Sequence, residues 1–158
     1  MNVAETRTAL TGNAVAVPPT IWRSAGELDL DANVKNAEFV FNNGITAAVY
    51  AGGVGEHDRL SAEQQKELLT AVTPAIRAKS SNACIGTGLG RTLERVKELV
   101  PTLAELEIAY AMMMPPNTDD TDEQVVYYTA VMGLLTENGI GPVLYPRPEH
   151  PMKADMVE

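Results

Sequence analysis

The chain has 158 residues, of which 45% are hydrophobic and 21% charged, and its formal net charge is −9. This composition is ordinary for a globular protein, so we expect a single domain over residues 1–158 with its own core. The acidic charge, without a lysine or arginine cluster, argues against nucleic acid as a partner. Because no window reaches the ~20 apolar residues of a membrane span, we expect no membrane partner either.

Few side chains that could hold a metal or form a disulfide are present. One cysteine, Cys84, excludes an internal disulfide and fits a reducing compartment. Two histidines, His57 and His150, are too few for a transition-metal site. Residues 1–13 lack the long apolar run of a signal peptide. We therefore predict a cytoplasmic protein without a metal or other cofactor, with Cys84 as a core residue on a strand.

Short apolar runs alternate with helical patterns along the whole chain. Strands are expected at residues 14–17, 47–51, 83–85, 108–113 and 142–145. Helices are expected at residues 31–41, from 62 onward, 92–105 and 122–138. Two capping boxes, Ser61-x-x-Gln64 and Thr121-x-x-Gln124, mark helix starts, and Pro74 predicts a kink or an early end. We expect residues 22–30 to be a loop.

The predicted strands recur at intervals of about 26 to 36 residues, the size of a βα repeat. A parallel α/β fold follows. It could be a five-stranded doubly wound open sheet or about five βα units of a (β/α)₈ barrel. Length favours the open sheet, because a whole barrel needs roughly 250 residues. Strand order discriminates the two: consecutive neighbours mean a barrel segment, and the order 2-1-3-4-5 means an open sheet.

The most informative stretch is the sequence TAAVYAGGVGE at residues 46–56. An apolar run of strand length leads directly into a glycine turn, Gly52 to Gly55, which can expose backbone N–H groups above the strand end. Binding sites of parallel α/β proteins lie at such strand ends. A second glycine-rich stretch, Gly86 to Arg91, lacks the third glycine of a dinucleotide fingerprint, so we interpret it as a tight βα turn.

An ordered series of short phrases runs from about residue 14 to the C-terminus. The phrases are Leu28-Asp29-Leu30-Asp31, Asn43-Gly44-Ile45, Gly52-Gly53-Val54-Gly55-Glu56, Leu60-Ser61, Pro115-Pro116 and Val143-Leu144-Tyr145-x-Arg147. In content and spacing this series resembles the dihydrodipicolinate synthase/N-acetylneuraminate lyase family of (β/α)₈ barrels. Such a resemblance favours a partial barrel over the open sheet.

The resemblance implies a class I lyase or dehydratase that binds pyruvate or another 2-keto acid as a Schiff base on a lysine. Gly52, Gly53, Val54 and Gly55 would cradle the keto acid's carboxylate through backbone N–H groups, since the family's usual pair of threonines is absent. The family's proton shuttle corresponds to Tyr145. Arg147 would suit a substrate carboxylate or hydroxyl, or is a solvated loop charge.

The sequence departs from the family pattern in three places. Asn117-Thr118 stand where many members have tyrosines, and His150 lies nearest to a synthase's substrate arginine. The Schiff-base lysine should lie roughly 30 residues beyond Tyr145. Only Lys153 follows Tyr145, and we interpret it as a solvated charge at a helix start.

We therefore expect the 158 residues alone to lack lyase activity, and we expect open strand edges to favour a homo-oligomer. The alternatives are a non-catalytic doubly wound binding module and a degenerate family member kept for an interaction.

Overall fold

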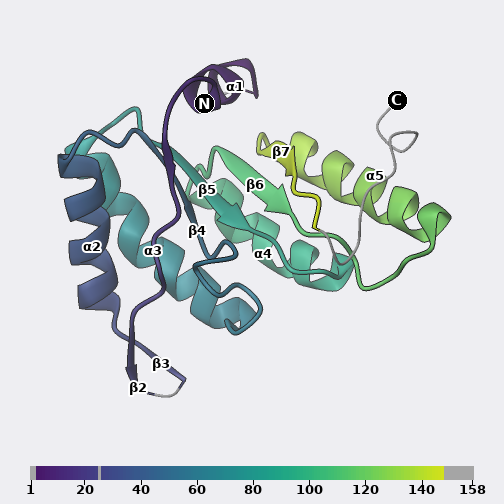
Figure 1. Ribbon diagram of the computed structural model, residues 1–158, viewed down its shortest axis with the longest axis horizontal. Helices are drawn as coiled ribbons and strands as arrows, with labels where there is room; N and C mark the ends of the chain where they lie inside the picture. The colour runs from purple at the N-terminus through teal and green to yellow at the C-terminus, as the bar shows by residue number, and fades with distance from the viewer. Residues whose placement is uncertain (1–2, 25, 148–158) are drawn as a thin grey trace.

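The computed structural model describes residues 3–24 and 26–147, which form one parallel sheet, a small hairpin and five helices within those ranges (Figure 1). In chain order the elements are α1 (Val3–Leu10), β1 (Val15–Ala16), β2 (Trp22–Ser24), β3 (Glu27–Leu28), α2 (Leu30–Asn42), β4 (Ala47–Tyr50), α3 (Ala62–Lys79), β5 (Cys84–Gly88), α4 (Leu93–Glu105), β6 (Tyr110–Met113), α5 (Thr121–Glu137) and β7 (Gly141–Leu144).

The five strands of the main sheet follow the order β1-β4-β5-β6-β7, and every neighbouring pair is parallel. Each strand therefore pairs with the next sheet strand along the chain, as in a segment of a (β/α)₈ barrel. A doubly wound sheet would have placed the first strand between two others. The prediction of a partial barrel is confirmed. The argument from length, which favoured the open sheet, is wrong, because chain length does not determine strand order.

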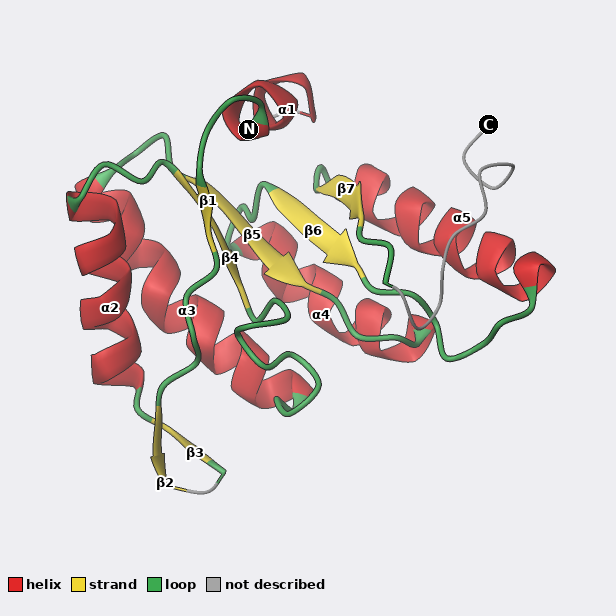
Figure 2. Cartoon of the chain, in the orientation of Figure 1, coloured by secondary structure: helices red, strands yellow, loops and turns green. Residues whose placement is uncertain are grey.

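Helices α2 to α5 cover one face of the sheet, and α1 lies on the opposite side (Figures 1 and 2). Alternate strand residues explain the two layers. Ala48, Ile85 and Ala111 join the core under the large helices. Residues of the other face, including Val49, Cys84 and Tyr110, form a smaller cluster against which Ala9 and Leu10 of α1 pack.

Cys84 lies fully buried on β5, as predicted from the sequence. Burial raises the pKa of its thiol to about 11. The thiol therefore stays protonated at neutral pH and serves as a small apolar group.

Two segments differ from their expected structure because of contacts with distant residues. Residues 22–30 contain the antiparallel pair β2–β3 and the start of α2, where a loop was expected. Asn33 of α2 holds the chain before β2, donating to Ile21 O at 2.8 Å and accepting from Ile21 N at 3.1 Å. Helix α1 was not expected, and it is held to the sheet by Ala9 and Leu10.

Two elements run past a predicted end, whereas the kink that was the other prediction for Pro74 stays a prediction. Helix α3 continues through Pro74 to Lys79. The proline removes one helical hydrogen bond, to the carbonyl of Thr70, and Thr70 is exposed, so water can replace that bond. Strand β5 runs on to Gly88, so Gly86 and Gly88 are strand residues and not part of a turn. Their missing side chains make room for the ring of Tyr110 and the carbonyl of Ala51.

The start of α5 differs from its predicted cap. Ser61 and Gln64 form the predicted capping box of α3, whereas α5 is capped by Asp120 and not by Thr121. Asp120 Oδ1 accepts from Glu123 N at 3.0 Å. Asp120 lies one residue before Thr121, and its carboxylate accepts from an N–H group of the first helical turn, which has no partner within the helix.

Asp120→Ala should lower the free energy of unfolding by about 1 kcal/mol, because it removes the cap of α5. Thr121→Ala is the matched control and should change stability by less than about 0.5 kcal/mol. Urea unfolding followed by circular dichroism measures both. Equal losses for the two variants would show that Asp120 is not the cap.

Candidate functional site

The loops after β4, β5, β6 and β7 meet at the carboxyl edge of the sheet, and the turn after β4 has the most constrained backbone of them. Ala51 and Glu56, at the two ends of this turn, have φ values of 48° and 57°, a left-handed conformation that is costly for residues other than glycine. Gly55 is required, because a Cβ there would lie 2.9 Å from Ala51 N. Gly53 has open space around it, with Arg147 Nη1 at 3.8 Å from its Cβ position.

Three successive backbone N–H groups of this turn, those of Gly53, Val54 and Gly55, have no described acceptor. Among the hydrogen bonds between described residues, none is donated by the backbone of Gly53, Val54 or Gly55. The turn is closed instead by Glu56 N and His57 N, which donate to Gly53 O and Gly52 O, each at 3.2 Å. Gly53 and Val54 are exposed. Free N–H groups in such a turn form a seat for a small anion.

The turn is anchored by the segment that contains β2. Thr20 Oγ1 donates to Gly55 O at 2.6 Å, and Trp22 Nε1 donates to Glu56 Oε2 at 2.8 Å. Arg59 Nη1 donates to the other oxygen of Glu56 at 3.0 Å. The hydrogen bond from Trp22, and to a smaller extent that from Arg59, lowers the pKa of the Glu56 carboxyl group. Sequence reasoning missed Thr20 and Trp22, because they lie more than thirty residues before their partners.

Arg147 and Tyr145 lie after β7 at the same edge of the sheet. Because Arg147 Nη1 approaches Gly53, the loop after β7 reaches the turn after β4, although two strands separate β4 from β7. Tyr145 follows β7 directly, and 37% of its surface is exposed. The structure thus brings Gly53 and Arg147 together. His150 and Lys153 lie outside the described residues.

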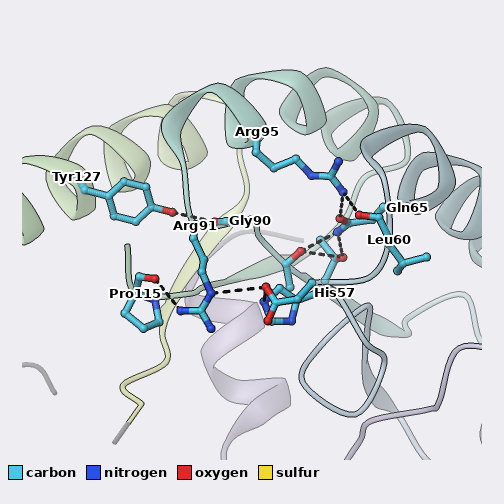
Figure 3. A network of polar contacts seen from close by, with 11 residues as sticks. His57, Leu60, Gln65, Gly90, Arg91, Arg95, Pro115 and Tyr127 are labelled. Atoms are coloured by element: carbon cyan, nitrogen blue, oxygen red, sulfur yellow. Dashed lines mark hydrogen bonds and ion pairs between the residues drawn. The ribbon is translucent and has the colours of Figure 1, made fainter. Parts of the chain in front are cut away.

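A buried polar network ties the end of β5 to α3 and α4 (Figure 3). Gln65 of α3, 1% exposed, donates from Nε2 to Thr87 Oγ1 at 2.8 Å and to Gly88 O at 2.7 Å. Arg95 Nη2 donates to Gln65 Oε1 and to Leu60 O, both at 3.1 Å. This network fixes the strand end beside the turn.

A second cluster, drawn in Figure 3, consists of His57, Asp58 and Arg91. The side chain of His57 is buried, with 4% of its surface exposed. His57 Nε2 lies 2.9 Å from Asp58 Oδ1, but the two atoms do not form a hydrogen bond. Arg91 Nε lies 3.5 Å from the same Asp58 oxygen, and Arg91 Nη1 donates to Pro115 O at 3.0 Å. Burial is the main cause that lowers the pKa of His57 below its usual 6.5. The positive charges of Arg91 and Arg147 lower this pKa further, whereas the charge of Asp58 and the hydrogen bond with the backbone of Gly52 raise it.

Stability should fall as the pH is lowered from about 7.5 to 5. The unfolded chain takes up a proton at His57 near pH 6.5, whereas the folded chain does so only at a lower pH, so acid favours unfolding. His57→Gln should flatten this pH dependence in urea unfolding. Asn117→Gln, at an exposed residue without a titratable group, is the control and should leave the slope as it is in the unmodified chain. An unchanged slope in His57→Gln would contradict the lowered pKa.

Other kinds of site find no support in the described part of the chain. Within residues 3–24 and 26–147, no three His, Cys, Asp or Glu side chains are grouped to hold a metal ion. The four lysines in these ranges, Lys35, Lys66, Lys79 and Lys97, lie on α2, α3 and α4 and not on a strand. In the same ranges, no helix combines the length and apolar character that crossing a bilayer requires.

The parallel strands in consecutive order, with helices on one face and open N–H groups at the carboxyl edge, define a segment of a (β/α)₈ barrel. The model of the dihydrodipicolinate synthetase family matches residues 10–151. The chain belongs to this family.

Individual relatives agree with this assignment. A 4-hydroxy-tetrahydrodipicolinate synthase from Prochlorococcus marinus (strain MIT 9301) is 31% identical over 93 residues, 59% of this chain and 31% of that protein. A probable 5-dehydro-4-deoxyglucarate dehydratase from Bacillus subtilis (strain 168) is 23% identical over 141 residues, 89% of this chain and 44% of that protein. The chain thus spans less than half the length of these relatives.

Solved structures agree on the fold. The dihydrodipicolinate synthase from Oceanobacillus iheyensis matches 97% of this chain and 50% of its own, with a TM-score of 0.79 and 22% identity. The sialic acid aldolase from Ruminococcus gnavus matches 92% of this chain and 49% of its own, with a TM-score of 0.80 and 14% identity.

Proposed function

We propose that this chain forms the carboxylate-binding part of a lyase or dehydratase site for pyruvate or a related 2-keto acid. The observation that carries the proposal is the set of backbone N–H groups at Gly53, Val54 and Gly55, which donate to no other described residue, with the Arg147 guanidinium beside Gly53. A carboxylate seated there receives backbone hydrogen bonds on one side and a charge-assisted hydrogen bond on the other. Gly52 is the first residue of the glycine turn, and its carbonyl accepts from His57 N.

Tyr145 is proposed as the proton shuttle of this site. Tyr145 follows β7 at the sheet edge that holds the turn, and a partly exposed phenol can exchange protons with a bound ligand. In family chemistry through a Schiff base, such a group protonates the leaving carbonyl oxygen and then assists cleavage of a C–C or C–O bond. Tyr145 supplies the proton transfer, and the turn supplies orientation.

No described residue is proposed as the Schiff-base lysine. A lysine nucleophile needs a desolvated position near the bound keto group, and the four described lysines lie on helices at the outer face of the sheet. This placement also favours a second candidate function, a family member that binds a keto acid without catalysis. Both candidates share the carboxylate seat and suit a reducing compartment such as the cytoplasm.

Pyruvate binding to the chain tests the shared carboxylate seat. By titration calorimetry we expect Arg147→Gln to weaken binding by about tenfold, the loss of one charge-assisted hydrogen bond. Arg23→Gln, which changes a half-exposed arginine on β2, should leave the affinity unchanged. Absence of pyruvate binding in the unmodified chain would overturn the proposal.

Borohydride trapping tests the separate statement about the lysine. Treatment of the 158-residue chain with pyruvate and borohydride should leave its mass unchanged, because the four described lysines lie on helices and Lys153 is expected to be a solvated charge. A stable pyruvate adduct would show that the chain does contain the nucleophile.

Self-association is a further part of the proposal. In the described sheet, β1 and β7 each pair along one edge only. Open strand edges invite pairing with another chain, so we propose a homo-oligomer in solution. A monomer by sedimentation velocity would contradict it.

A further inference from the structure

The hydroxyl of Thr20 contacts the glycine turn from a segment 35 residues earlier in the chain. Thr20 is buried, with 8% of its surface exposed, and its Oγ1 donates to Gly55 O at 2.6 Å. This hydrogen bond is short, and its acceptor is the carbonyl of a buried residue. Thr20 lies between β1 and the β2–β3 hairpin, outside the proposed carboxylate seat. The threonine therefore acts on the turn from another segment of the chain.

A series of hydrogen-bonded peptide units connects Gly55 to the seat. The carbonyl of one residue and the N–H group of the next belong to a single planar peptide unit. The Gly55 carbonyl shares its unit with Glu56 N, which donates to Gly53 O at 3.2 Å. The Gly53 carbonyl shares its unit with Val54 N, which has no described acceptor. The Thr20 hydroxyl is thus the first donor of the series, and the Val54 N–H group is the last.

All hydrogen bonds of this series are donated in the same direction, toward the seat. A hydrogen bond accepted by the carbonyl of a peptide unit polarises that unit and makes its N–H group a stronger donor. The bond from Thr20 also holds the peptide that precedes Glu56, whose φ of 57° is costly for a residue other than glycine. The hydroxyl therefore both orients the turn and polarises its peptide units.

The N–H group of Gly53 belongs to a separate series and provides an internal comparison. Its peptide unit contains Gly52 O, which accepts from His57 N at 3.2 Å. The unit of His57 N contains Glu56 O, which accepts from Arg59 N at 2.8 Å. This second series begins at a backbone N–H group and does not include the threonine hydroxyl. Loss of the hydroxyl should therefore affect the two neighbouring N–H groups of the seat differently.

We propose that Thr20 is a positioning residue of the carboxylate seat, whose hydroxyl orients the turn and strengthens the Val54 N–H group as a donor to the bound carboxylate. The inference rests on the proposed function, because it is in the seat that Val54 N meets its ligand. Thr20 does not contact the ligand and acts through two peptide units. The affinity of the seat thus depends on a residue of the segment before β2.

Variants of two buried threonines test the role of the hydroxyl. Thr20→Val has nearly the same shape without a donor, and by titration calorimetry it should weaken pyruvate binding about fivefold. Thr20→Ser keeps the hydroxyl and should retain the affinity within about twofold. Thr73→Val is the matched control, because Thr73 is 2% exposed and its hydroxyl has no described hydrogen-bond partner. It should leave the affinity unchanged. Equal weakening by Thr20→Val and Thr20→Ser would overturn the inference.

Amide signals in the NMR spectrum of the ¹⁵N-labelled chain distinguish polarisation from a general loosening of the turn. Without ligand, Thr20→Val should shift the amide signals of Glu56 and Val54 more than that of Gly53. An equal or larger shift at Gly53 would show that the hydroxyl only holds the turn in place, and the inference fails.

The outcomes separate this inference from the proposed function. If the unmodified chain does not bind pyruvate, the seat itself is wrong and both proposals fail. If it binds pyruvate and Thr20→Val binds equally well, only this inference fails. Should Thr20→Val not fold, as checked by circular dichroism, the unmodified chain decides: pyruvate should shift the amide signal of Glu56 together with that of Val54. An unmoved Glu56 signal would overturn the inference.

Discussion

Gly88→Ala should destabilise the chain by about 3 kcal/mol, because the end of β5 has no space for a methyl group. A Cβ at Gly88 would lie 2.2 Å from Ala51 O and 3.3 Å from Gly52 Cα, and both are backbone atoms that no side-chain rotation can move. Ala51 is already held in a left-handed conformation. The shift needed to relieve the clash would disturb the β4–β5 pairing or the glycine turn, so pyruvate binding should weaken as well.

Gly133→Ala is the matched control for this substitution. Gly133 is an exposed residue of α5, and a Cβ there meets no atom within 4 Å. Alanine in a helix is favoured over glycine by roughly 0.5–1 kcal/mol, so this variant should be more stable than the unmodified chain. Urea unfolding of both variants measures the contrast. A loss of less than about 0.5 kcal/mol for Gly88→Ala would show that the turn yields at little cost.

The alternation of strands and helices was predictable from the sequence, because each element has a local signal. Apolar runs predicted the five strands of the main sheet, and helical spacing predicted α2 to α5. The glycine turn at residues 52–55 was recognisable for the same reason, since tight backbone geometry requires residues without a side chain. Strand order was not a local property, and it was only the ordered series of family phrases that favoured a barrel.

The features that could not be predicted depend on residues far apart in the chain. Trp22 contacts Glu56 and Thr20 contacts Gly55 across 34 and 35 residues. Nothing in the sequence near Arg91 indicates that it meets Asp58 and Pro115. The prediction placed the cap of α5 one residue too late for a local reason: Asp120 and Thr121 are adjacent, and both are good capping residues. Tertiary contacts therefore determine the site more than local patterns do.

Gln65→Leu should lower the free energy of unfolding by about 3 kcal/mol, although leucine is apolar and of similar size. Gln65 is buried, and its amide makes three hydrogen bonds with Thr87, Gly88 and Arg95. Leucine would leave the buried Gly88 carbonyl and Thr87 hydroxyl without this donor. It would also leave Arg95, whose pKa burial already lowers, with one fewer acceptor. Glu67→Leu, at an exposed position two residues along α3, is the control and should change stability by less than about 0.5 kcal/mol.

A double variant separates the lost hydrogen bonds from the stranded charge. If part of the cost of Gln65→Leu comes from leaving the Arg95 guanidinium partly buried without its amide acceptor, then Gln65→Leu combined with Arg95→Leu should cost less than the sum of the single variants. We expect a coupling energy of about 1 kcal/mol, measured by urea unfolding of the three variants. Additive losses would mean that Gln65 and Arg95 stabilise the end of β5 independently, and that Gln65 acts through Thr87 and Gly88 alone.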